Sequence, residues 1–115
     1  MAQELSINAT MKNEMAGLLL LKSQTLAPGA SWVQAPPGQI AGNVAAAFSA
    51  ACAGGASLDG SVVYLPQGST TELTFTFSVD GKGNTATASY HAIGPTVGAQ
   101  ITQGDDAVAI FSYAR

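Results

Sequence analysis

Charged residues are scarce in this chain of 115 residues: they make up 10% of it, against about a quarter in an ordinary soluble domain. Only four are basic, and they are scattered along the sequence at Lys12, Lys22, Lys82 and Arg115. Nucleic-acid binding needs clustered basic side chains that neutralise phosphates, so we expect no nucleic-acid partner. Small neutral residues fill the surface instead and leave little charge to oppose a membrane, a glycan or a second copy of the chain.

Reactive side chains are equally few. The single cysteine, Cys52, can form no intramolecular disulfide and no thiolate metal cluster, so we expect a small buried hydrophobic residue there. A hydrolytic triad would have to combine the single histidine, His91, with a serine and either Asp80 or Asp105, but no Gly-x-Ser-x-Gly motif accompanies them. The sequence therefore predicts a protein that is not an enzyme and that uses no metal or cofactor.

Long apolar runs are also absent. The leucine run at residues 18–21 is far shorter than the ~20 residues that span a bilayer, and we interpret it as a strand buried on both faces. The N-terminus carries Glu4 and lacks the basic and apolar regions of a signal peptide. We expect synthesis in the cytosol without a signal peptide, with release or deposition preceding any action on a target-cell membrane.

What the chain does have is alternation of apolar and polar residues. In residues 71–80 the apolar side chains fall on every second position, at Leu73, Phe75, Phe77 and Val79, and the turn Gly81-Lys-Gly-Asn84 follows. A period of two that ends at a turn predicts a half-buried strand and a hairpin. The returning limb, residues 85–93, places His91 on the polar face with the hydroxyl groups of Thr85, Thr87 and Ser89. A solvated strand histidine is one interpretation of His91, and a binding contact or pH-sensitive position is the other.

Similar patterns predict strands at residues 5–11, 15–21, 61–65, 97–102 and 107–113, with a turn at 12–14. Residues 41–53 fit either a helix, which alanine favours, or a strand, in which Val44 and Phe48 share a face; the neighbouring strands favour the second. Short strands about ten residues apart, separated by turn signals, predict an all-β fold. We expect one domain over residues 1–115, a single-domain antiparallel β-sandwich.

The only tryptophan, Trp32, lies between the proline- and glycine-rich breakers Ala27-Pro-Gly-Ala30 and Ala35-Pro-Pro-Gly38. We therefore place it near a loop and not in the middle of a sheet. The indole either closes one end of the sandwich or anchors the protein at an interface, where its apolar ring and polar N–H suit a membrane surface.

Several motifs occur in an order and spacing that resembles the aegerolysins, small acidic β-sandwich proteins of fungi and bacteria. The best-matched part is residues 29–84, about half of the chain. The motifs are Gly29-Ala-Ser-Trp32, Pro36-Pro37 with Ile40, Phe48-Ser-Ala50, Asp59-Gly60-Ser-Val-Val-Tyr64, Leu73-Thr-Phe-Thr-Phe77 and Gly83-Asn84.

The resemblance implies a membrane-recognising sandwich that binds a lipid headgroup or cell-surface receptor. It also implies a small toxin or cytolysin component, insecticidal or defensive, that helps a larger pore-forming partner. Trp32, Asp59, Gly60 and Tyr64 match the family's pattern, with Gly60 and Tyr64 as framework, so Trp32 and Asp59 join His91 as candidate binding residues.

Two other classes of function remain open. The face of Thr74, Thr76, Ser78, Thr85, Thr87 and Ser89 offers hydroxyl groups beside His91, which favours a carbohydrate-binding, lectin-like module. The neutral surface and unpaired sheet edges favour a self-associating structural or storage protein, and with it a homo-oligomer.

Overall fold

Ten β-strands make up the regular structure of a computed structural model that describes residues 4–53 and 57–115. They are β1 (Leu5–Asn13), β2 (Leu19–Leu26), β3 (Ala30–Gln34), β4 (Gln39–Ile40), β5 (Val44–Cys52), β6 (Leu58–Pro66), β7 (Leu73–Val79), β8 (Thr85–Tyr90), β9 (Thr96–Ile101) and β10 (Asp106–Ala114). Within the described ranges there is no helix long and apolar enough to cross a membrane.

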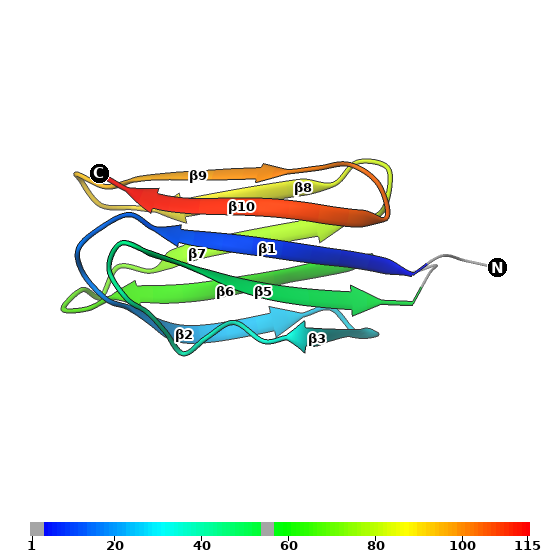
Figure 1. Ribbon diagram of the computed structural model, residues 1–115, viewed down its shortest axis with the longest axis horizontal. Helices are drawn as coiled ribbons and strands as arrows, with labels where there is room; N and C mark the ends of the chain where they lie inside the picture. Colours follow the sequence, from blue (N-terminus) through cyan, green and yellow to red (C-terminus); the bar gives the residue numbers. More distant parts are fainter. Residues whose placement is uncertain (1–3, 54–56) are drawn as a thin grey trace.

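The strands form two five-stranded sheets that face each other (Figure 1). The first sheet has the order β3-β5-β1-β10-β9, and the second has the order β4-β2-β6-β7-β8. The predicted all-β sandwich is confirmed. The expectation that all strands are antiparallel is wrong at one place, because β1 and β10 pair in parallel at the centre of the first sheet.

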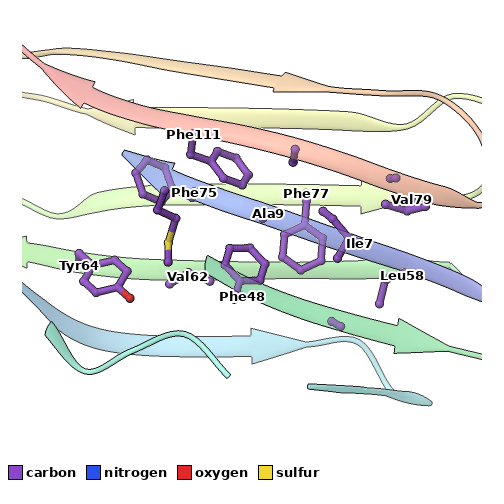
Figure 2. Close-up of a cluster of buried hydrophobic side chains, with 14 of the residues drawn as sticks. Ile7, Ala9, Phe48, Leu58, Val62, Tyr64, Phe75, Phe77, Val79 and Phe111 are labelled. Carbon is purple, nitrogen blue, oxygen red and sulfur yellow. The ribbon is translucent and has the colours of Figure 1, made fainter. Parts of the chain in front are cut away.

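The hydrophobic core lies between the two sheets. Alternate residues of each central strand point inward, as the burial of Leu73, Phe75, Phe77 and Val79 in β7 illustrates. Aromatic rings from opposite sheets meet there: Phe75 stacks on Phe111 with ring centroids 4.8 Å apart, and Figure 2 shows both rings inside the cluster. Cys52 is buried as expected, and burial raises the pKa of its thiol, so it packs as an apolar side chain.

The predicted hairpin from β7 to β8 is confirmed, but its second limb ends at Tyr90 and not at Ile93. Beyond Tyr90 the chain turns toward β9, with Gly94 in the left-handed region at φ 113°. Residues 91–93 consequently lie in a loop. The ambiguous stretch at residues 41–53 contains β5, in agreement with the strand interpretation.

The predicted turn at residues 12–14 is wrong, because β1 runs on through Lys12 and Asn13. Asn13 is 1% exposed, and its side-chain amide donates hydrogen bonds to the carbonyl oxygens of Gly17, Ile40 and Ala41. A residue type that usually marks a turn is thus held in a strand by distant partners. Because β1 extends to Asn13, the loop after it is shifted along the chain, and the next strand begins at Leu19 and not at residue 15.

The leucine run at residues 18–21 is not buried on both faces. Of the four residues only Leu19 is buried, while Leu18, Leu20 and Leu21 are half-buried. The short strand β4 pairs with β2 only at Leu19 and Leu20, so the second sheet nearly ends at β2. A strand close to a sheet edge keeps part of its surface in solvent.

Asn84 joins the two sheets at one end of the sandwich. It is 5% exposed, and its amide donates to the carbonyl oxygens of Thr102 and Gly104, each at 2.9 Å. Its Oδ1 atom accepts hydrogen bonds from the backbone N–H groups of Asp80 and Gly81, both at 3.1 Å. The turn between β7 and β8 is therefore fixed against the turn between β9 and β10.

Candidate functional site

Trp32 lies in β3, a five-residue edge strand of the first sheet, so it is near loops and away from the middle of the sheet, as expected. The indole is half-buried and reaches across the sandwich to Phe77 of the second sheet, with ring centroids 6.5 Å apart. Its pairing with β5 contains an irregularity between Trp32 and Gln34. The proline and glycine breakers flank the strand without removing Trp32 from it. The ring closes the open side of the core, not one of its ends.

His91 follows the last residue of β8 and is exposed, in the loop that leads to β9. It does not lie among the threonines of the strand, as the alternation had predicted. The same loop carries Ile93, whose relative exposure of 102% is the highest among the exposed large apolar residues of the described chain. Ala92 and Gly94 beside it are exposed as well. The sequence had assigned Ile93 to a strand, and the following Gly94-Pro95 was the signal that it belongs to a loop.

Asp59 lies in β6 and points to the outer face of the second sheet, in register with Ser78. Its Oδ1 atom accepts hydrogen bonds from the hydroxyl groups of Ser57 at 2.9 Å and Ser78 at 2.5 Å. Two donors on one oxygen fix the orientation of the carboxylate.

The three predicted binding residues do not form one site. Asp59 and His91 belong to opposite ends of the second sheet, because Tyr90 is in register with Leu73 and Leu73 with Tyr64. Tyr64 lies five residues along β6 from Asp59, roughly 17 Å at about 3.3 Å per residue. Trp32 and Asp59 lie on opposite faces of the second sheet, since the indole packs against Phe77 in the core and Asp59 points outward.

A shallow depression of about 540 Å³ crosses the outer face of the second sheet beside Asp59. Its floor is a row of residues in register, Leu26, Gly60 and Phe77; the side chains of Leu26 and Phe77 point inward and Gly60 has none, so the outer face of the row is backbone. One side of the depression is formed by Asp59 and Ser78. The other side is formed by the next outward row, Thr25, Ser61 and Thr76.

Hydroxyl groups dominate these two sides. Thr25 and Ser61 are hydrogen-bonded to each other, with their oxygen atoms 2.8 Å apart. The sequence had already grouped Thr76 and Ser78 on a hydroxyl face. It gave no signal for Thr25 and Ser61, because their place beside Thr76 depends on a strand register that includes a bulge between Leu21 and Ser23.

The carboxylates are unevenly distributed. Five of the seven lie at the end where the β7–β8 and β9–β10 turns meet: Glu4, Asp59, Asp80, Asp105 and Asp106. Lys82 is the one basic residue at this end, which we call the acidic end. Hydrogen bonds from the backbone N–H groups of Gly83 and Lys82 lower the pKa of Asp80, so this carboxylate stays ionised.

The opposite end is built from the loops at residues 14–18, 41–43, 67–72 and 91–95, and we call it the 91–95 end (Figure 1). It holds the other two carboxylates, Glu14 and Glu72, and the remaining basic residues, Lys12, Lys22 and Arg115. Lys22 and Glu72 form an ion pair that is about half exposed. The side-chain charge of the acidic end is therefore −4 and that of the 91–95 end +1, together the −3 of the chain.

His91 is far from Asp80 and Asp105, which lie at the acidic end, so the described residues do not assemble the triad considered above. In residues 4–53 and 57–115 no group of three or more histidine, cysteine or acidic side chains is placed to hold a metal ion. The arrangement offers recognition by hydroxyl groups, one oriented carboxylate and an exposed apolar loop.

No family model matches the chain, and no curated protein matches it in sequence. Among solved structures, the fold is similar to that of the lipid-binding protein Nakanori, with a TM-score of 0.81. The match covers 96% of this chain and 71% of that one at 10% sequence identity. At this identity the likeness shows the fold alone, so the resemblance to the aegerolysins stays a prediction. The comparison establishes that the chain has the same sandwich architecture as a lipid-binding protein.

Proposed function

We propose that this protein is a non-enzymatic, membrane-binding β-sandwich that meets the lipid surface with its 91–95 end. The observation that carries the proposal is the complete exposure of Ile93 at the tip of a loop. Complete burial of such a side chain away from water gains about 1.5–3 kcal/mol, which is the upper limit for its insertion into a lipid surface. The fold shared with a protein whose name describes lipid binding supports the same function.

The surroundings of Ile93 suit this contact. The other loops at this end consist largely of small or neutral residues, such as Met15-Ala-Gly17, Ala41-Gly42 and Ser69-Thr-Thr71. The carboxylate of Glu72 is neutralised by Lys22. Of the two carboxylates at the 91–95 end, only the exposed Glu14 has no ion pair among the described residues, and it has to stay in water when this end approaches headgroups, because burying an unpaired charge is costly.

The uneven charge gives the protein an orientation. A lipid surface with negative charge repels the acidic end and weakly attracts the 91–95 end, over distances set by the salt concentration. The long axis measures 48 Å, so the two ends lie far apart compared with a Debye length of about 10 Å. In this orientation Trp32 stays in the core at the side of the sandwich, and its role as a membrane anchor is the weaker prediction.

Co-sedimentation with liposomes tests the proposal. We expect binding to vesicles of phosphatidylcholine with sphingomyelin and cholesterol, and stronger binding when phosphatidylserine is added at low salt. Ile93→Asn should weaken the partition by about tenfold or more. The matched control is Val33→Asn, because Val33 is also highly exposed, at 72%, but lies in edge strand β3. Equal binding of both variants and the wild type would refute the assignment of the 91–95 end, and no binding to any vesicle would refute the function.

The resemblance to the aegerolysins extends the proposal to a more specific role. In it the chain is a small toxin component, insecticidal or defensive, that recognises a lipid or receptor, as a homo-oligomer or monomer, for a larger pore-forming partner. Such a helper should bind vesicles without releasing an entrapped dye. Dye release by the protein alone would contradict the helper role and leave membrane binding intact.

A further inference from the structure

We infer that the depression beside Asp59 is a second binding site, and that its ligand is a neutral carbohydrate. The site lies on the outer face of the second sheet near the acidic end, away from the 91–95 end. It does not depend on the proposed membrane contact. The inference rests on the orientation of one carboxylate, on the hydroxyl groups opposite it and on the chemistry that the depression lacks.

The carboxylate of Asp59 is prepared to accept further hydrogen bonds. Ser57 and Ser78 both donate to Oδ1, and Oδ2 accepts no hydrogen bond from the described residues. An ionised carboxylate has room for about four hydrogen bonds and forms stronger ones than a neutral acceptor. Two neighbouring hydroxyl groups on a sugar ring can each donate a hydrogen bond to Oδ2.

The opposite side of the depression can both donate and accept. Between Thr25 and Ser61 one hydroxyl donates to the other, so one hydroxyl hydrogen of the pair is free for a ligand. Thr76, the third member of this row, is exposed. The row that contains Asp59 and the row that contains Ser61 are separated by two residues along the strand, a distance of about 6.6 Å. A ring that lies across the floor would therefore meet the carboxylate on one side and hydroxyl groups on the other.

The floor permits close approach. Gly60 and the backbone of Phe77 form it, and on the core side Gly60 is tightly packed against the Phe77 ring and the Leu26 side chain. The packed core side chains below Gly60 thus support the backbone that forms the floor. The volume of about 540 Å³ lies within the roughly 300–1,000 Å³ typical of small-molecule sites.

Other ligand classes fit less well. None of the residues that line the depression is basic, and the charge of Asp59 would repel a phosphate or carboxylate group. A divalent cation is coordinated by six or more oxygen atoms, and calcium sites commonly use several carboxylates, whereas the depression offers one carboxylate. An ammonium group could pair with Asp59 but would leave the hydroxyl row unused. A neutral polyol uses both sides.

A glycan array, followed by calorimetric titration with the strongest-binding sugar, tests the inference. We expect millimolar or tighter binding of at least one neutral mono- or disaccharide. Asp59→Asn should weaken that binding at least tenfold. Asp106→Asn is the matched control, since Asp106 also lies at the acidic end and accepts a serine hydroxyl, from Ser6, but on the outer face of the first sheet. It should leave sugar binding unchanged.

A second pair of variants guards against misfolding of Asp59→Asn. Thr76→Val removes one hydroxyl from the depression and keeps a β-branched side chain, and we expect a several-fold loss of sugar affinity. Thr87→Val makes the same change in the adjacent position of the neighbouring strand, outside the depression, and should have no effect.

Three results would overturn the inference: no binding of any neutral sugar, equal effects of each variant and its control, or binding of phosphocholine in place of sugars. Ile93→Asn should leave sugar binding intact. A failure of the carbohydrate site is thus distinguishable from a failure of the membrane contact.

Discussion

The indole of Trp32 stands edge-on to the ring of Phe48, with centroids 5.6 Å apart and an interplanar angle of 88°. Phe48 in turn lies 5.5 Å from Phe77, so a residue of an edge strand completes an aromatic cluster that spans both sheets. Trp32 therefore contributes to the packing of the core, and its substitution should lower the stability of the fold.

Trp32→Ala should lower the free energy of unfolding by about 2–3 kcal/mol, less than for a fully buried tryptophan, because the ring is half-buried. Urea unfolding followed by circular dichroism measures the change. Val33→Ala, at the exposed neighbouring position, should change it by about 0.5 kcal/mol or less. If folded Trp32→Ala lost liposome binding as Ile93→Asn is expected to do, the indole would be an anchor after all.

Gly60→Ala should destabilise the protein by about 1–3 kcal/mol, because overpacking a tight core forces neighbours to move. A Cβ atom at this position would lie 2.5 Å from Cζ of Phe77 and 2.8 Å from the backbone oxygen of Thr25. Thermal unfolding is the measurement. Gly83→Ala is the control, since a Cβ atom there meets nothing within 4 Å. Equal melting temperatures for both variants would show that the core yields easily at Gly60.

Asn84→Ala should cost about 2–4 kcal/mol of stability, because four hydrogen bonds of a buried amide are lost and backbone groups are left without partners. Hydrogen exchange should accelerate first in the turns at residues 80–84 and 102–105. Asn8→Ala, at an exposed position of β1, serves as the comparison and should be nearly neutral. Unchanged exchange in both turns would contradict the role of Asn84 as a link between the sheets.

Alkaline pH should weaken the fold through two buried tyrosines. Burial raises the pKa of Tyr64, whose hydroxyl donates to the Pro37 carbonyl at 2.7 Å, and raises the pKa of Tyr113 to about 12. The folded state holds these protons more tightly than the unfolded chain, where the pKa is about 10. The stabilisation is therefore complete below about pH 10 and is lost as the pH rises through the folded values.

Urea unfolding at a series of pH values from neutral upward measures this loss. Tyr113→Phe has no proton to lose at that position, so its stability should fall less steeply above about pH 10. Parallel curves for the variant and the wild type would exclude Tyr113 as a source of the alkaline sensitivity.

The hairpin of β7 and β8 was predictable because its signals are local. Alternation over seven residues and a turn of glycine and asparagine follow directly from the sequence, and the same holds for β9 and β10, whereas the alanine-rich β5 was also compatible with a helix. The ends of strands were less predictable. Asn13 looks like a turn residue until its three carbonyl partners, up to 28 residues away, are known.

The candidate sites were predictable only in part. Asp59 and the hydroxyl groups of Thr76 and Ser78 were identified, but the depression also needs Thr25 and Ser61, which a bulged register brings beside them. His91 and Ile93 were placed in a strand because alternation continued past Tyr90. Ile93 is exposed because β8 stops pairing with β7 after Tyr90. The point where two strands stop pairing depends on the folded structure and not on the local sequence pattern.

The parallel neighbours β1 and β10 also decide how the protein can be made. Ser6 and Asp106 are 100 residues apart and hydrogen-bonded, so the middle of the first sheet forms only when the last strand has left the ribosome. Until then β1 and β5 expose a sheet edge, while the β6–β7–β8 meander can already assemble from contacts close in sequence. Nascent chains are thus open to misassociation during that wait, and a chaperone that shields β1 would raise the yield of folded protein.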